Sequence, residues 1–388
     1  MAASASAQNT MTSSPYSMFG LGEMASGLYG QNTSMAGVTV GMREGMLMNI
    51  ENPAGLTALD SCKLFAEASA FVKNERYRSD GSSSSAFTGN FSAFSLGGRI
   101  MRRWYMSVGV TPYSFVGYYF KSSQELEGSP GTFVTSTFSG TGGLSKAFLS
   151  QGFSLTKHLS VGMNLNFIFG NMTQNEIQSA MTVSREMSGR SFYADFGLQY
   201  HRPIARETFL TVGAIYGYKQ RISLKNTVTV TGSSTETPYN QKRVTQYLPQ
   251  YIGIGSSLAH KKWTYALDYL FRQYGVLNSS DSRVKFRDSH ELRLGVCYFP
   301  NGFSSSSYWK RMSYKAGVSV STPYLRLKGQ SGGAYRVSVG LGLPVLNGRI
   351  NTAFYYDRLQ LQGNALRRDI MGFTVTYTLS EKFYQVKL

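Results

Sequence analysis

The stretch Leu159-Ser160-Val161-Gly162-Met163-Asn164-Leu165-Asn166-Phe167 decides the fold, because apolar residues alternate with small or polar ones along its whole length. Side chains two positions apart lie on the same face of a β-strand. This stretch therefore predicts a strand with one apolar face and one small or polar face. The same period recurs at 192–200, 292–298, 337–343 and 373–379. The chain is predicted to be all-β.

Marked over the whole chain, the alternation predicts fourteen strands, and the connections between them alternate in length. The strands are expected at 62–72, 87–100, 104–120, 132–150, 159–170, 190–200, 208–223, 243–258, 263–275, 288–299, 311–325, 334–343, 349–360 and 370–379. Short turns are expected at 101–103, 156–158, 201–207, 260–262 and 344–348, and longer polar loops at 73–86, 121–131, 171–189, 226–242 and 276–287. The turn at 300–310 is longer than this pattern prefers.

An even number of strands, with short turns on one side and long loops on the other, is typical of a transmembrane antiparallel β-barrel of a Gram-negative outer membrane. The short turns and both termini are then expected in the periplasm. Tyr118, Tyr200 and Tyr298 lie near strand ends, where aromatic residues form interfacial girdles. A soluble β-sandwich is the alternative, but its turns need not separate by length in this way.

Composition agrees with such a barrel. Only 15% of the 388 residues are charged, against about 25% in typical soluble domains. The apolar runs fall far short of the roughly 18 residues that a membrane-spanning helix needs. The net charge of +18 is spread over turns and loops, whereas nucleic-acid binding requires a clustered basic face. Nucleic acid is therefore not an expected partner, while cations in the outer loops are expected to pair with phosphates of outer-membrane lipid and glycolipid.

The N-terminal residues do not alternate like strands. Residues 1–7 resemble the end of an export signal, with Ala5-Ser6-Ala7 as an A-x-A cleavage site before Gln8. Residues 8–61 are rich in glycine and methionine and are expected to form a hatch that plugs the lumen. The barrel is expected at 62–379, and residues 380–388 are expected to be a periplasmic extension.

The methionines of the hatch have two interpretations. Methionine is unbranched and fits irregular spaces, so these residues either fill gaps in the packing or line a pocket for an apolar small molecule. The candidate pocket residues are Met18, Met24, Met35, Met42, Met46 and Met48.

Residues 34–40, Ser-Met-Ala-Gly-Val-Thr-Val, and the motif Asn52-Pro53-Ala54-Gly55-Leu56 carry a resemblance to a known family. They resemble the N-terminal hatch of the long-chain fatty acid transporter (FadL-like) family of outer-membrane β-barrels. The opening at 16–22, Tyr-Ser-Met-Phe-Gly-Leu-Gly, is similar to Bacteroidetes members. The resemblance implies a fourteen-stranded barrel with a plug, and outer-membrane transport of hydrophobic compounds such as fatty acids.

In that family the third strand is kinked and opens the wall sideways to the bilayer. The third strand here contains Gly109, Thr111, Pro112 and Tyr113. Proline removes a ladder donor and glycine weakens a strand, so a bulge is expected at this place. The bulge either forms a lateral opening or only bends the strand.

Charged residues are expected on the lumen face. Opposite charges on neighbouring strands, Glu67 with Arg99 and Glu291 with Lys315, are expected to pair across the wall and to anchor the hatch.

No motif supports an enzyme. Residues 329–333, Gly-Gln-Ser-Gly-Gly, lie between two expected strands, whereas a nucleophile elbow needs a strand-to-helix turn. The four histidines are scattered, so neither a metal site nor a cofactor is expected. Cys62 and Cys297 are expected on separate strands as free thiols.

Two functions remain at this stage. The first is transport of a small apolar compound past the hatch, with exit at the bulge in strand three. The second is a non-transporting barrel subunit of a larger outer-membrane complex for protein secretion or barrel assembly, with other outer-membrane proteins as partners. Fold alone does not decide between them.

Overall fold

A computed structural model describes residues 12–25, 30–79, 82–125, 128, 131–179, 181–232, 236–277, 284–300, 307–327, 329–361 and 366–382. The expected signal remnant, residues 1–7, lies outside these ranges. So does the end of the C-terminal extension, residues 383–388. Within them, no helix is long and apolar enough to span a membrane.

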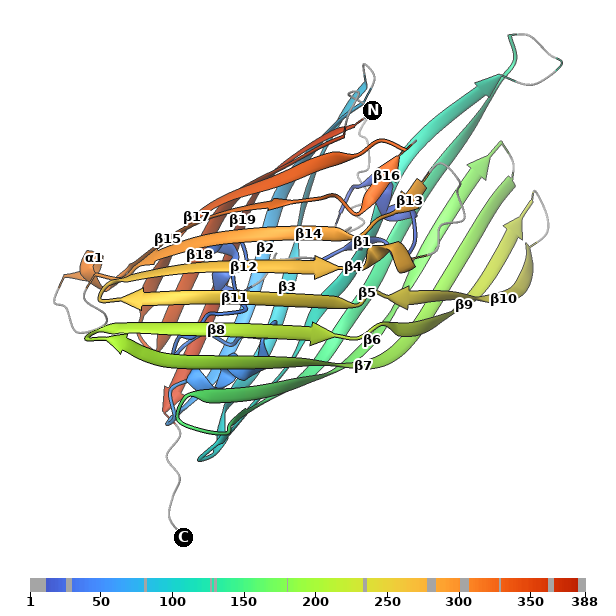
Figure 1. The fold of residues 1–388 in the computed structure, drawn as a ribbon. Helices are drawn as coiled ribbons and strands as arrows, with labels where there is room; N and C mark the ends of the chain where they lie inside the picture. The colour runs from blue at the N-terminus through green and yellow to red at the C-terminus, as the bar shows by residue number, and fades with distance from the viewer. Residues whose placement is uncertain are drawn as a thin grey trace.

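The strands form a closed antiparallel barrel with fourteen strand positions in its wall, as the sequence predicted (Figure 1). The last strand pairs with the first, from Arg367 opposite Arg78 to Lys382 opposite Lys63. The strands of the wall are β2 (Lys63–Ser79), β3 (Ser82–Met101), β4 (Trp104–Glu125), β5 (Phe133–Ser154), β6 (Leu159–Gln178), β7 (Met181–Ala205), β8 (Thr208–Gly217), β9 (Gln220–Thr231), β10 (Glu236–Leu248), β11 (Tyr251–His260), β12 (Trp263–Arg272), β14 (Ser289–Tyr298), β15 (Ser313–Ser321), β17 (Gly332–Val345), β18 (Gly348–Leu361) and β19 (Arg367–Lys382).

Two of the fourteen positions are each occupied by two shorter strands in succession. β8 and β9 both pair with β7 and are separated by Tyr218 and Lys219, so together they occupy one position in the wall. β10 and β11 are separated by Pro249 and Gln250. Proline has no backbone donor for the ladder, which explains the second interruption.

Several expected outer loops are wrong, because the strands continue through them. Residues 73–86, 121–131, 171–189 and 226–242 were expected as loops, yet β2 to β7, β9 and β10 extend far into these ranges. The hairpin ladders continue there on polar and charged residues without the apolar alternation that marks a lipid-facing strand. Period-two hydrophobicity therefore locates the band of the wall that faces lipid and misses the strand ends beyond it.

The connections on the long-loop side hold short elements. The 3₁₀ helix η4 (Tyr274–Val276) and strand β13 (Val284–Phe286) follow β12, and β13 pairs with β16 (Leu325–Leu327). In the expected long turn at 300–310, residues 301–306 lie outside the described ranges. The short helix α1 (Tyr308–Arg311) follows them.

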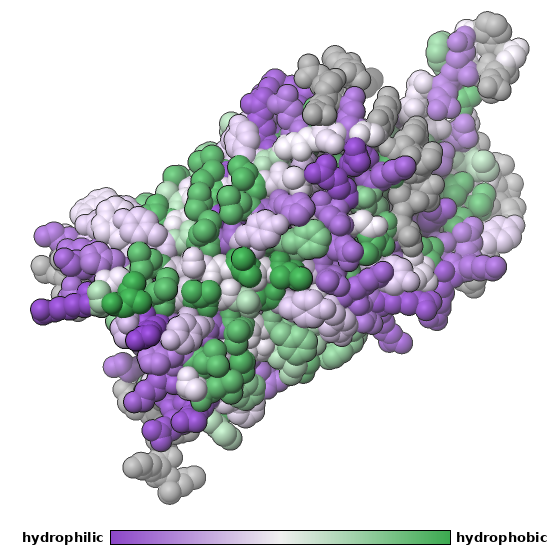
Figure 2. All heavy atoms as spheres, viewed as in Figure 1, coloured by the Kyte–Doolittle hydropathy of each residue, from purple (hydrophilic) through white to green (hydrophobic). Residues whose placement is uncertain are grey.

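The outer surface of the wall carries an apolar band. Figure 2 shows this band in green across the middle of one face, between two hydrophilic ends. Outward-facing Phe354, Phe373 and Val375 belong to it and are more than a third exposed. On the neighbouring strand the band ends after Val72, because Asn74, Arg76 and Arg78 follow on the same face.

The N-terminal segment, residues 12–61 within the described ranges, lies against the lumen side of the wall, where Figure 1 draws it in dark blue. It contains the 3₁₀ helices η1 (Pro15–Met18), η2 (Gln31–Met35) and η3 (Pro53–Ala58) and the two-residue strand β1 (Glu23–Met24). At the other end of the chain, Ser380–Lys382 belong to β19 rather than to an extension.

Candidate functional site

The motif Asn52–Leu56 starts η3. Asn52 is fully buried and caps this helix, because its Oδ1 accepts a hydrogen bond from the backbone N–H of Ala54 at 3.2 Å. Its Nδ2 donates to the carbonyl of Val40 at 2.7 Å and to the carbonyl of Leu198 on β7 at 3.2 Å. One side chain thus joins two parts of the N-terminal segment to the wall.

A belt of glycines on the lumen face of the wall seats the N-terminal segment. A Cβ added to any of them would overlap atoms of that segment. Gly152, Gly162 and Gly197 face Asn52, Pro53 and residues near them, Gly213 and Gly255 face Val40, Gly295 and Gly317 face Met35, and Gly340 faces Ser34. The backbone of the wall is therefore packed closely against the segment, whose backbone or Cβ atoms lie where a side chain of the wall would be.

The candidate pocket methionines lie mostly in packed clusters. Met46 and Met48 pack with Leu56, Phe65 and Tyr105. The remaining four divide into two groups: Met35 and Met42 are buried beside Val38 and Leu47, while Met18 and Met24 are half-buried at the edge of a cluster on the wall. A role for these six in ligand binding stays a prediction.

Arginines of the wall hold acidic residues of the N-terminal segment. Arg293 on β14 is 1% exposed and contacts Glu51 at 3.1 Å and Glu291 at 2.8 Å. Arg272 on β12 contacts Glu291 at 2.7 Å and Glu51 at 3.4 Å. Two arginines and two carboxylates thus form one network that joins the segment to two strands.

Further charged contacts lie around the ring. Asp268 on β12 accepts hydrogen bonds from the backbone N–H groups of Thr39, at 2.6 Å, and Val40, at 2.9 Å. Arg349 forms an ion pair with Glu44 of the segment. Burial raises the pKa of Glu44, but Lys315 and Arg349 lower it by more, so its pKa lies below the usual value and the carboxylate stays charged.

The predicted charge pairs of the lumen are wrong. Glu67 lies opposite Ser95, four positions from Arg99, and it accepts hydrogen bonds from Gln31 and Thr378 instead. Arg99 donates to the carbonyls of Met101 and Arg102. Glu291 lies opposite Ser321, whereas Lys315 lies opposite Cys297. The strand assignments were right, but the sequence does not give the register that decides which residues face each other.

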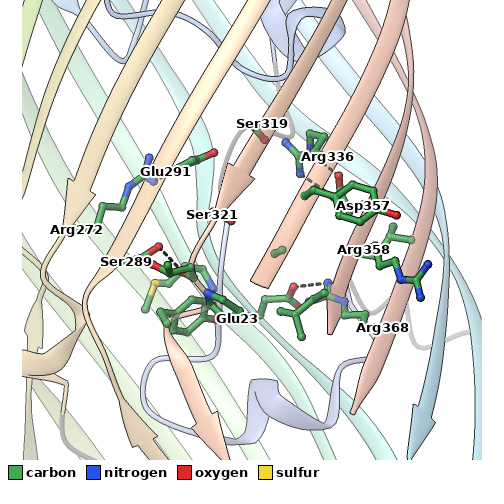
Figure 3. Close-up of a pocket in the computed structure, with 18 of the residues that line it drawn as sticks. Glu23, Arg272, Ser289, Glu291, Ser319, Ser321, Arg336, Asp357, Arg358 and Arg368 are labelled. Atoms are coloured by element: carbon green, nitrogen blue, oxygen red, sulfur yellow. Dashed lines mark hydrogen bonds and ion pairs between the residues drawn. The ribbon is translucent and has the colours of Figure 1, made fainter. Parts of the chain in front are cut away.

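The cavities of the lumen are small, and charged and apolar residues line them together. The one shown in Figure 3 has a volume of about 170 Å³ and is lined by charged residues that include Glu23, Arg272, Glu291, Arg336, Asp357 and Arg368. In it Arg336 bonds both carboxylate oxygens of Asp357, and Arg368 pairs with Glu23 of β1 and, at 2.9 Å, with Glu75 of β2. A second cavity of about 110 Å³ includes Tyr113, Lys146 and Asp195. An apolar hollow of about 550 Å³ is lined by exposed side chains such as Leu267, Leu294 and Val318 of the lipid-facing surface.

The wall divides between β3 and β4. Their ladder runs from Met101 opposite Trp104 to Phe94 opposite Val110, where it stops. Beyond this point the hairpins β2–β3 and β4–β5 diverge, and Figure 1 shows their ends far apart. We call this region the fork.

The N-terminal segment covers the β4 side of the fork. Glu23 and Met24 of β1 pair with Phe115 and Ser114, and the N–H of Ala25 donates to the carbonyl of Tyr113. Ser17 accepts a hydrogen bond from the N–H of Gly117 and donates one to its carbonyl. The edge of β4 that β3 leaves is therefore paired with the chain's own N-terminus.

The residues expected at a lateral opening surround the fork. Gly109 lies just below it, where a Cβ would meet the carbonyl of Phe94. Pro112 lies at a bulge in the β4–β5 ladder, and Tyr113 is the extra residue of that bulge. Thr111 is buried beside them. Whether this region opens stays a prediction.

Sequence reasoning did not identify the glycine belt, Glu51 or the partners of Arg272 and Arg368. The belt has a signal in the sequence, because Gly162, Gly197, Gly295 and Gly340 each occupy the non-apolar phase of an alternating strand. The contacts of Glu51 have none, since they join residues more than two hundred positions apart.

Comparison with solved structures shows the same fold at low identity. The toluene transporter TbuX of Ralstonia pickettii has a TM-score of 0.61 at 14% identity, covering 92% of this chain and 98% of that chain. The toluene transporter TodX of P. putida gives 0.62 at 16%, covering 92% and 99%. A FadL homologue of Pseudomonas aeruginosa gives 0.62 at 11%, covering 93% and 100%. The expected likeness in fold to FadL-type barrels is confirmed.

Comparison with curated proteins gave no match. A family model described as BamG matches residues 1–387. The match extends over almost the whole chain, including the N-terminal segment and every strand of the barrel. The chain belongs to the BamG family.

Proposed function

We propose that the chain is a non-transporting barrel subunit of a larger outer-membrane assembly, of the kind that secretes proteins or inserts barrels. In this proposal the N-terminal segment is a fixed plug, and the outer surface of the barrel binds partner proteins. The chain would lie in the outer membrane of a Gram-negative bacterium, with both termini in the periplasm and lipid and glycolipid around it.

The observation that supports this proposal is the fixation of the N-terminal segment. A moving plug would have to break the contacts of Glu51 with Arg272 and Arg293, which leaves the Glu51 carboxylate without its arginine partners while the two arginines keep Glu291. It would also have to leave the glycine belt, where the segment packs directly on the backbone of the wall. The cavities that remain beside it are small, about 170 and 110 Å³, and their linings mix charged with apolar side chains. Both volumes lie below the range usual for the site of a small-molecule ligand.

Native purification tests this proposal. The full chain, carrying an affinity tag, would be extracted from outer membranes with a mild detergent and analysed by size and subunit composition. We expect a complex with partner proteins in fixed stoichiometry. A lone barrel that carries only lipid would contradict the proposal.

Transport of small hydrophobic compounds, fatty acids included, is the second candidate, and the fork favours it. TbuX and TodX, which share the fold, are toluene transporters, and the ladder of this chain ends at Phe94 and Val110, within the wall. In this candidate the cargo passes Met24 and leaves sideways near Pro112. A disulfide or a bulky aromatic residue placed across β3 and β4 near Ser95 and Thr111 should then block uptake of a fatty acid or of toluene while the barrel stays folded. Unchanged uptake in a verified cross-linked barrel would exclude this route.

A further inference from the structure

The two edges of the fork are protected unequally. On the β4 side the free edge carries Pro112, a bulge and Lys121, and β1 pairs with it. Proline, bulges and charges are the usual devices that keep an edge strand from pairing with another chain. On the β3 side the edge Ser82–Ala93 has neither a proline nor a charged residue, and its irregularity is a bulge at Ser92, where the ladder with β2 shifts register.

The β3 edge is long and uncharged. Its sequence is Ser-Ser-Ser-Ser-Ala-Phe-Thr-Gly-Asn-Phe-Ser-Ala, with neither a proline nor a charged residue. In the described part of the chain this stretch pairs with β2 on one side, and its ladder with β4 begins only at Phe94. The N–H of Phe91 donates a hydrogen bond to the side chain of the preceding residue, Asn90, at 2.7 Å. Such an edge is a template for an added strand.

The edge runs from the bilayer to its outer surface. Phe91 and Phe94 face outward and are 55% and 46% exposed. Gly89 lies opposite Val72, the last apolar outward residue of β2, and Phe87 lies opposite Asn74. The lower part of the edge is therefore in lipid, where unpaired backbone groups are costly because no water can bond them.

We infer that the β3 edge Ser82–Ala93 is a docking site for an extended β-strand of a partner protein. This inference rests on the proposed function. The partner strand pairs with the β3 backbone, as β1 already pairs with β4 in this molecule. The outward-facing residues of the partner strand are apolar beside Phe91 and Phe94 and small or polar beside Ser83 and Ser85. They thus match the outward face of β3 at each height.

Site-specific photo-cross-linking in intact cells tests the docking site. A photoreactive side chain would replace Ser83, Ser85 or Phe87, one at a time, in the full chain. These three face outward, because they lie opposite Arg78, Arg76 and Asn74. We expect cross-links to one partner polypeptide at residues that advance by two, in one direction along its sequence, as the probe moves from 83 to 87. Only an added strand gives that order.

Met371 on β19 is the matched control position. It lies opposite Asn74, in the same row as Phe87, is 57% exposed, and belongs to a strand paired on both sides. We expect no partner cross-link there. In a second experiment, Phe87→Lys should remove the partner from the purified complex, while Met371→Lys should leave it bound, because a charge on an edge blocks strand pairing.

Three cross-linking results would overturn the inference: cross-links to lipid alone, cross-links to a second copy or to the chain's own residues, and partner cross-links without the two-residue order. A purified complex that keeps its partner in the Phe87→Lys variant would overturn it as well. If partners co-purify but any of these results is found, the docking site is wrong and the proposed function stands. If no stoichiometric partner is found, the proposed function fails as well.

Discussion

The glycine-belt half of the barrel and the fork close the wall in different ways. In the belt half each strand pairs with both neighbours, and the N-terminal segment packs on glycines and is held by ion pairs. At the fork β3 and β4 diverge. The N-terminal segment pairs β1 with the edge of β4 and does not pair with the edge of β3. The belt half therefore stays closed, whereas the fork leaves the backbone of the β3 edge without a second neighbouring strand in the described part of the chain.

The largest effect is expected from Arg293→Ala in the belt half. The change removes the hydrogen bonds of Arg293 to Glu51, Glu291 and the carbonyl of Gly37, and leaves Arg272 as the arginine that pairs with both carboxylates. We therefore expect a loss of about 3 kcal/mol in the free energy of unfolding. Denaturation of the purified barrel in urea measures it. Arg367→Ala is the control, because the Arg367–Asp369 pair is far more exposed and should contribute little to the free energy of unfolding. Equal losses in the two variants would show that the buried network does not hold the plug.

Gly162→Val should have the next largest effect. Its side chain would overlap the backbone of Pro53 and Ala54, so we expect about 1–3 kcal/mol of destabilisation or a displaced plug. The shift in mobility between heated and unheated samples on a gel reports folding. Gly333→Val is the control, since a Cβ there meets no atom within 4 Å. A fully stable Gly162→Val barrel would mean that the segment yields easily at the belt.

Asn52→Ala should cost about 1–2 kcal/mol, because η3 loses its cap and two backbone carbonyls lose a donor. Thermal unfolding of the reconstituted barrel measures the change. Asn347→Ala, which removes an exposed amide that bonds Glu381, is the control and should be nearly neutral. If the two variants melt alike, the Asn52–Leu56 motif does not fasten the segment.

The smallest global effect is expected at the fork, from Gly22→Val. Gly22 has a φ of +88°, and a Cβ there would meet the carbonyl of Phe115, so β1 should detach from β4. Because β1 has only two residues, we expect local opening with less than about 1 kcal/mol of change in global stability. Hydrogen exchange should speed up at Ala25 and Gly117 and stay slow in β14. Uniform acceleration over the barrel would show that fork and belt unfold as one unit.

The sequence alone predicts the wall well and the interior poorly, for a physical reason. The two-residue period at Leu159–Phe167 follows from local strand geometry, so the number of strands in the wall, fourteen, could be predicted. The pairs Glu67–Arg99 and Glu291–Lys315 were wrong because a shift of a few residues in register changes every cross-strand neighbour. Contacts such as Glu51 with Arg293 depend on the path of an irregular segment, which has no period from which to predict it.

A disulfide that locks the plug tests the central claim most directly. The hydroxyls of Thr57 in η3 and Ser160 on β6 are 2.8 Å apart, so cysteines at both positions are close enough to bridge. Conductance and toluene flux would be measured in reconstituted bilayers with this double variant, oxidised and then reduced. Arg293→Ala would be the variant expected to leak. We predict that the double variant passes nothing in either state; flux that appears on reduction and disappears on oxidation would contradict a fixed plug.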